Sequence, residues 1–106
     1  MKKTASAILA LAALTVASAA FADQLEDMMK KNGCVACHAE DKKILGPAYK
    51  DVAAKYHGDA KAAAMLEEKV KKGGSGVWGQ IPMPPNSQVS DADIKKMVAL
   101  ILALKK

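Results

Sequence analysis

The run GCVACH at positions 33–38 concentrates the reactive side chains of this sequence. It holds both cysteines of the chain, Cys34 and Cys37, and one of the two histidines, His38. Side chains of these types at this spacing are compatible with four kinds of site. They are a short disulfide, part of a zinc site, a thioredoxin-like dithiol and a covalent haem attachment motif.

The amino-terminal segment indicates export. Two lysines precede an uncharged apolar run, about residues 5–20, which ends in the small-x-small triplet Ala20-Phe21-Ala22. This layout is typical of a cleaved signal peptide, and the alanine-rich run is shorter than the ~20 strongly apolar residues of a spanning helix. We predict that residues 1–22 are removed, and that residues 23–106 form one domain of 84 residues with no stable membrane insertion.

The charge of the mature chain suits a protein partner. All 16 cationic side chains are lysines, and removal of the two in the signal segment leaves 14 lysines against 11 carboxylates, a net charge of +3. A mild basic excess favours an acidic protein partner. Nucleic acid is not expected as a partner, because the chain has no arginine and no basic stretch interleaved with aromatic residues.

The periodicity of apolar residues predicts an all-α domain with four helices. The expected helix starts are Asp23, Lys50, Asp59, and Ser90 or Asp91. Asp23 and Glu26 have the spacing of a capping box, and Gly33 is a natural stop for the first helix. In the third helix, Ala63, Leu66 and Val70 form the expected apolar stripe. No segment alternates as a strand does.

Residues 73–89, GGSGVWGQIPMPPNSQV, separate the third and fourth helices. Three prolines and four glycines rule out regular helix through most of this segment. A connection of this length in a small domain is usually functional or disordered. The apolar side chains of Trp78, Ile81 and Met83 indicate that it packs against a group other than the small protein core.

These features favour haem attachment over the other three chemistries. A disulfide would close a ring of four residues and leave His38 without a role, while a thioredoxin-like dithiol needs an α/β fold. Structural zinc sites usually use two spaced ligand pairs, yet His57 stands alone, 19 positions after His38. In Cys-x-x-Cys-His, two thiols add across the haem vinyl groups, and the following imidazole becomes an iron ligand.

The iron then needs a second axial ligand or keeps an open position. Met28, Met29, Met65 and Met97 lie in helical patterns, where core packing explains them. Met83 lies between Pro82 and Pro84, which stiffen the backbone and aim the thioether. Met83 is therefore the favoured ligand and His57, expected at the surface, the alternative.

Three stretches carry a resemblance to a known family. They are GCVACH (33–38), ILGPAYKDVAAKY (44–56) and GVWGQIPMPPN (76–86). With them, residues 23–106 resemble the small monohaem class I cytochromes c of bacteria, the periplasmic electron carriers of the c-551 and c-552 type. The resemblance implies about four short helices wrapped around one covalently bound haem c, in a periplasmic protein expected to be a monomer.

The resemblance also implies residue roles. Cys34 and Cys37 would form the thioethers, and His38 and Met83 would be the axial iron ligands. The Pro47 carbonyl would accept the His38 ring N–H, the usual support of a metal-bound histidine. Three further residues correspond to haem-contacting positions: Trp78 and Lys69 near propionates, and Asn86 near the axial methionine.

The function implied is electron transport, not enzymatic catalysis. The protein would carry one electron from a respiratory donor to a terminal reductase, oxidase or peroxidase. Its acidic partners would dock on lysines near the haem edge, with candidates Lys30, Lys31, Lys42, Lys43, Lys71 and Lys72. Two alternatives stay open: a haem enzyme or gas sensor with five-coordinate iron, and a structural module held by zinc or a disulfide. We expect a cleft bounded by Cys34, Cys37, His38, Pro47, Trp78 and Met83.

Overall fold

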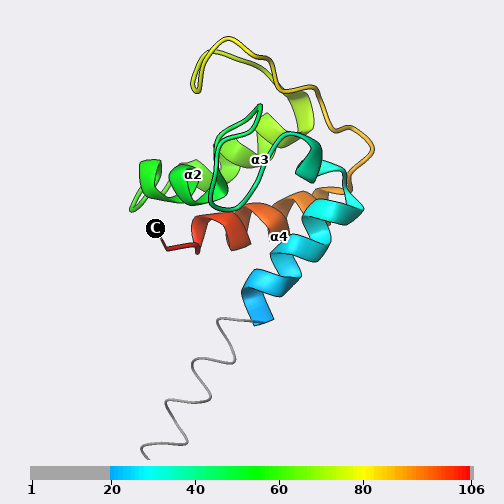
Figure 1. Ribbon diagram of the computed structural model, residues 1–106, viewed down its shortest axis with the longest axis vertical. Helices are drawn as coiled ribbons and strands as arrows, with labels where there is room; N and C mark the ends of the chain where they lie inside the picture. The colour runs from blue at the N-terminus through cyan, green and yellow to red at the C-terminus, as the bar shows by residue number, and fades with distance from the viewer. Residues whose placement is uncertain (1–19, 106) are drawn as a thin grey trace, which may run out of the picture.

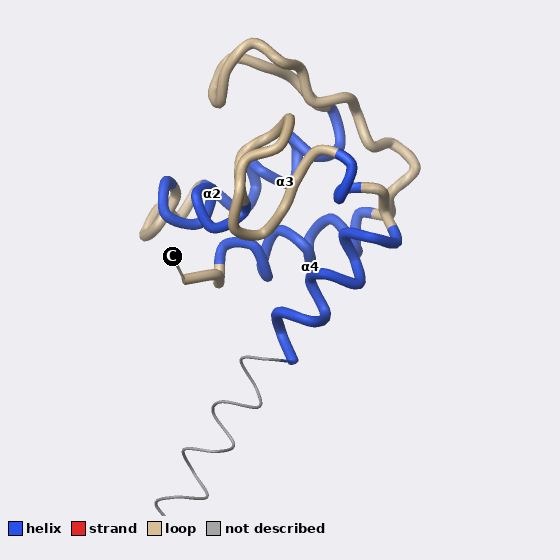
Figure 2. The backbone as a smooth tube through the Cα atoms, viewed as in Figure 1, coloured by secondary structure: helices blue, strands red, loops and turns tan. Residues whose placement is uncertain are grey.

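The computed structural model describes residues 20–105, and these residues form an all-α domain. Residues 20–31 are helical, and α2 (Tyr49–Lys55), α3 (Ala62–Lys72) and α4 (Asp91–Leu102) follow, with a short 3-10 turn, η1, at Cys34–Ala36. Figure 1 shows their arrangement, and Figure 2 shows helices joined by loops, without a strand in the described part. The predicted all-α class is confirmed. The predicted signal peptide lies almost wholly outside the described residues.

The first helix begins earlier than predicted. Residue 20 is already helical, so Asp23 lies within the helix and the expected capping box of Asp23 and Glu26 is wrong. Alanine has the highest helix propensity, which explains why the helix includes Ala20 and Ala22. Glu26 instead pairs with Lys30 one turn later, at 2.9 Å, and this hydrogen bond raises the pKa of the lysine. The helix ends before Gly33, which has a left-handed φ of 75°, as expected.

The third helix begins later than predicted. Asp59 forms a turn in which its Oδ1 accepts from the Lys61 backbone N–H at 2.9 Å, and α3 starts at Ala62. An aspartate side chain that accepts a hydrogen bond from the backbone two residues later favours a turn, because its oxygen is then not free to cap a helix. Ala62 is buried, whereas Ala63, expected on the apolar stripe, is exposed.

The other two boundaries agree with the sequence. α2 begins at Tyr49, one residue before the expected start. Ser90 caps α4 as predicted, with its Oγ accepting from the Asp93 backbone N–H at 3.2 Å. This bond satisfies one of the free N–H groups at the start of the helix.

The core is built around α4, which contacts both α2 and α3. One cluster joins the first helix, α2 and the end of α4, and it consists of Leu25, Met29, Tyr49, Val52 and Ile101. A second cluster lies toward the start of α4 and consists of Val89, Ile94, Met97 and Val98. Leu66 packs against both clusters, so α3 closes the core on the side of the long loop.

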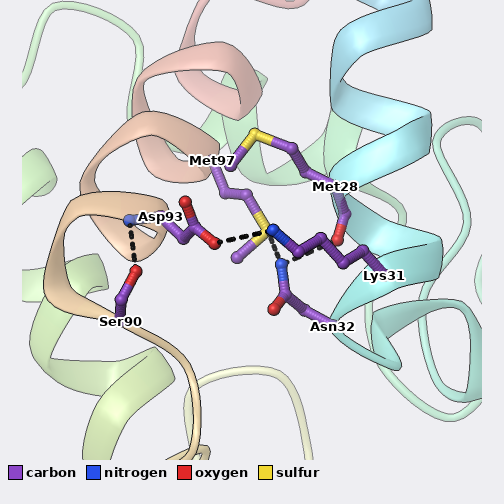
Figure 3. Close-up of polar contacts among 6 residues, drawn as sticks. All are labelled: Met28, Lys31, Asn32, Ser90, Asp93 and Met97. Carbon is purple, nitrogen blue, oxygen red and sulfur yellow. Dashed lines mark hydrogen bonds and ion pairs between the residues drawn. The ribbon is translucent and has the colours of Figure 1, made fainter.

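Polar contacts hold the end of the first helix against α4 (Figure 3). Asn32 donates through Nδ2 to the Met28 carbonyl at 2.9 Å and to Met97 Sδ at 3.8 Å. Lys31 Nζ lies 3.7 Å from Asp93 Oδ2. Because GCVACH begins immediately after Asn32, these contacts place the motif relative to α4.

Candidate haem-binding site

A hollow lies between α2, α3, α4 and the long loop, and it gathers every site residue predicted from the sequence. The six residues expected to bound a cleft all line it, as do Lys69 and Asn86. The remaining lining is mostly apolar and comes from Gly33, residues 45–46, α2 with the following Tyr56, α3, α4 and residues 74–84. Four separate elements therefore meet at one cavity.

The cysteines enter the hollow from η1. Gly33 precedes the turn in a left-handed conformation, and the His38 backbone N–H donates to the Cys34 carbonyl at 2.9 Å. Cys34 and Cys37 are free thiols, each half-buried. Burial raises the pKa of the Cys34 thiol. The structure thus presents two unbonded thiols on the same cavity wall.

A contact on Nδ1 of His38 leaves the other ring nitrogen, Nε2, available to bind a metal. Nδ1 lies 2.8 Å from the Pro47 carbonyl oxygen. A carbonyl can only accept, so Nδ1 carries the proton, and in the neutral ring Nε2 has the free lone pair. This is the support that metal-bound histidines usually have.

Two further residues touch the His38 ring, and the sequence reasoning assigned them no role. The Tyr49 ring stacks on it with centroids 4.9 Å apart and planes at 24°. Gly46 lies so close that an added Cβ would sit 2.5 Å from His38 Cε1. Both follow His38 within the quoted stretch ILGPAYKDVAAKY. A ring stack between loop and helix residues has no sequence pattern that could have indicated it.

The backbone of Met83 is fixed by the start of the long loop. Its N–H donates to the Gly74 carbonyl at 2.8 Å, and its own carbonyl accepts from the Gly74 N–H at 3.0 Å. Gly73 has a φ of 73°, and a Cβ there would collide with the Met83 carbonyl. The loop closes on itself because glycine occupies this position. Met83 is half-buried and lines the hollow.

The alternative ligand His57 lies elsewhere. It follows the end of α2, is exposed and does not line the hollow. Within residues 20–105, no three His, Cys, Asp or Glu side chains are grouped closely enough to hold a metal ion. The four ligands considered for zinc are therefore not brought together.

The remaining predicted residues lie around the loop. Asn86 Nδ2 donates to the Val70 carbonyl at 3.0 Å and to the Pro84 carbonyl at 3.2 Å, which ties the loop to α3. Lys69 lies against Gly74, where an added Cβ would be 2.7 Å from Nζ. Trp78 is 38% exposed, and Lys55 Nζ is 5.5 Å from its ring centroid.

The lining residues fit a large, mostly apolar group with a metal at its centre. Leu45, Val77 and Ile81 expose 51%, 52% and 62% of their surfaces while facing the hollow. Apolar exposure of this extent in a concave site marks a binding surface. Two thiols can add to the haem vinyl groups, and an imidazole nitrogen and a thioether can ligate its iron.

Comparison with known proteins agrees with this fit. The family profile described as Cytochrome c matches residues 26–105. Cytochrome c-552 of Nitrosomonas europaea is 56% identical over 96 residues, which cover 91% of each chain. Cytochrome c-551 of Pseudomonas aeruginosa is 51% identical over 90 residues, 85% of this chain and 86% of that protein. The crystal structure of wild-type Nitrosomonas europaea cytochrome c552 has a TM-score of 0.73 at 57% identity, covering 76% of this chain and 99% of that one.

The fold and the site define a small all-α protein with a single haem attachment motif. The chain belongs to the cytochrome c family, as a small monohaem class I member. It carries one covalently bound haem c with its iron, and its activity is electron transfer.

Proposed function

We propose that the protein is a periplasmic one-electron carrier whose haem is held by thioethers to Cys34 and Cys37 and ligated by His38 and Met83. The observation that carries this proposal is the meeting of all four side chains at one apolar hollow. They come from two segments, residues 34–38 and the long loop. His38 and Met83 are 45 positions apart in the sequence.

Each ligand has a chemical consequence for the carrier. When bound, haem supplies a one-electron iron couple. The Pro47 carbonyl holds the His38 proton on Nδ1 and makes Nε2 a stronger donor. The Met83 thioether favours the reduced iron more than a second imidazole would. Ligation by both side chains would leave no open iron position for oxygen or a substrate, which supports a carrier over an enzyme.

The surrounding residues support this geometry. Asn86 holds the loop that carries Met83 through its bonds to Val70 and Pro84. Lys69 and Trp78 line the hollow. There the lysine ammonium and the indole N–H would bind the haem propionates. We also propose that the carrier acts as a monomer after removal of residues 1–22.

No helix within residues 20–105 is long and apolar enough to cross a membrane.

The test is the mature protein made in a periplasm with haem attachment machinery. After denaturation, its mass should equal residues 23–106 plus one haem. In the native oxidised state it should show the weak red-end sulfur-to-iron absorption band. Covalent haem without this band would refute the Met83 ligand and favour His57 or an open iron. A mass without haem would refute the whole proposal, and a longer mass would refute cleavage before Asp23.

Ion pairs within the chain distinguish two of the six lysines proposed to dock acidic partners. Lys30, Lys31, Lys71 and Lys72 each form an ion pair with a carboxylate of this chain. Lys42 and Lys43 take part in no such pair among residues 20–105. The Lys43 backbone also bridges His38, beside the hollow.

Replacing both Lys42 and Lys43 by glutamine should therefore slow electron transfer with an acidic redox protein. We expect a decrease of roughly severalfold at low ionic strength, since unpaired charges near the docking face steer encounter most strongly. Stopped-flow kinetics across a salt series measures it. Lys30→Gln with Lys72→Gln removes the same charge and is the control. Equal slowing by both pairs would show that net charge, rather than this position, matters.

A further inference from the structure

Residues 46–49 contact the His38 ring at three places. The Pro47 carbonyl oxygen lies 2.8 Å from Nδ1. Gly46 lies against the ring, because a Cβ added there would be 2.5 Å from Cε1 and 2.9 Å from each ring nitrogen. The Tyr49 ring stacks on the imidazole at 4.9 Å between centroids. The imidazole is thus held by a bond, by close backbone contact and by a stack.

The backbone on both sides of His38 is tied to the same segment. The Gly46 N–H donates to the Cys37 carbonyl at 2.8 Å, and the Tyr49 N–H donates to the Ala39 carbonyl at 3.0 Å. Cys37 and Ala39 are the immediate neighbours of His38. Residues 46–49 therefore bind the backbone on both sides of His38 as well as its ring, which fixes the position of the His38 ring relative to these residues.

Tyr49 is itself firmly placed. It is the first residue of α2 and is 7% exposed, in the cluster that includes Val52 and Ile101. Cys34, the first cysteine of the attachment motif, packs against the same cluster. The aromatic ring that stacks on the imidazole thus belongs to the core against which this cysteine lies. A buried ring at a helix start moves little and is a suitable surface against which to orient another ring.

The hydrogen bond to Pro47 does not by itself fix the ring plane. It locates one atom, and the imidazole can still turn about the N–H···O direction. A stacked ring opposes that rotation because turning the imidazole would drive its edge into the aromatic face. We propose that Tyr49 is a positioning residue that sets the ring plane of His38, and so the orientation in which Nε2 is presented to the iron. This inference rests on the proposed ligation by His38.

The test is the proton NMR spectrum of the oxidised haem-loaded protein. The shifts of the four haem methyl groups depend on the orientations of both axial ligands, so the His38 ring plane is also read directly from nuclear Overhauser contacts between its ring protons and the haem meso protons. Tyr49→Phe keeps the ring but removes the hydroxyl, and we expect the wild-type order of the four shifts. Tyr49→Leu removes the stack, and we expect a changed order or a second set of methyl resonances. Gly46→Ala should also change the order, because its methyl group would displace the imidazole.

The control is Ile94→Ala, which removes buried volume from α4 outside the hollow. It should lower stability and leave the methyl order unchanged. The wild-type order in Tyr49→Leu, or an equal change in Ile94→Ala, would overturn the positioning role. If Tyr49→Leu does not accumulate with haem, Gly46→Ala decides: an unchanged order there would show that contacts from residues 46–49 do not set the plane of the His38 ring, and it would overturn the positioning role. Absence of shifted histidine ring protons in the wild type would instead refute the ligation by His38.

Discussion

Replacing Met83 by leucine should abolish the red-end sulfur-to-iron band of the oxidised protein and lower its reduction potential. Leucine has nearly the volume of methionine, so we expect the loop to keep its packing. The substitution does remove the sulfur donor. The loss of a thioether destabilises the reduced iron, and the fall should lie within the ~0.8 V range that axial ligands set in haem proteins. Added imidazole should bind the opened position. Absorption spectra and a redox titration measure these changes.

Met65 offers a matched control for this substitution. It also lines the hollow, from α3, and exposes 40% of its surface. Met65→Leu should keep the band, because packing explains a methionine within a helix and Met83 is the proposed iron ligand. Loss of the band in Met65→Leu, with its retention in Met83→Leu, would reverse the assignment. If both variants lack the band and the wild type has it, the loop does not hold Met83 independently of α3.

Replacing Ile94 by alanine should cost about 2–5 kcal/mol of unfolding free energy, the range for large-to-small changes in a core. Ile94 is 2% exposed and packs in the cluster with Val89, Met97 and Val98. α4 contacts both α2 and α3, so a cavity beneath it weakens the element around which the domain is built. Urea unfolding of the haem-loaded protein, followed by circular dichroism, measures the loss.

Lys96 is the control on the same helix. It is exposed and follows Lys95, so Lys96→Ala should change stability by no more than about 0.5 kcal/mol. A loss in Ile94→Ala below about 1 kcal/mol would show that the covalent haem, rather than the helix packing, supplies most of the stability. Because the haem and the core are separate contributions, this outcome would leave the ligation unaffected.

Most of the elements could be predicted from local patterns. The stop at Gly33 and the cap at Ser90 were correct because each depends on a residue and its immediate neighbours. The start of the first helix was wrong because residues 20–22 are already helical, so Asp23 does not stand at the helix start in this chain. The start of α3 was wrong because Asp59 can cap a turn as readily as a helix, and the two cannot be told apart from spacing.

The sequence by itself determined the all-α class, the attachment motif and the candidate ligands. These follow from residue types, periodicity and a fixed spacing of cysteines and histidine, which are properties of short segments. The tertiary structure decided that Met83 and not His57 shares a hollow with His38, since this depends on how the long loop folds back onto Gly74. It alone showed that Tyr49 and Gly46 hold the His38 ring, because a stack and a close approach are distances between segments, and a linear pattern carries no distances.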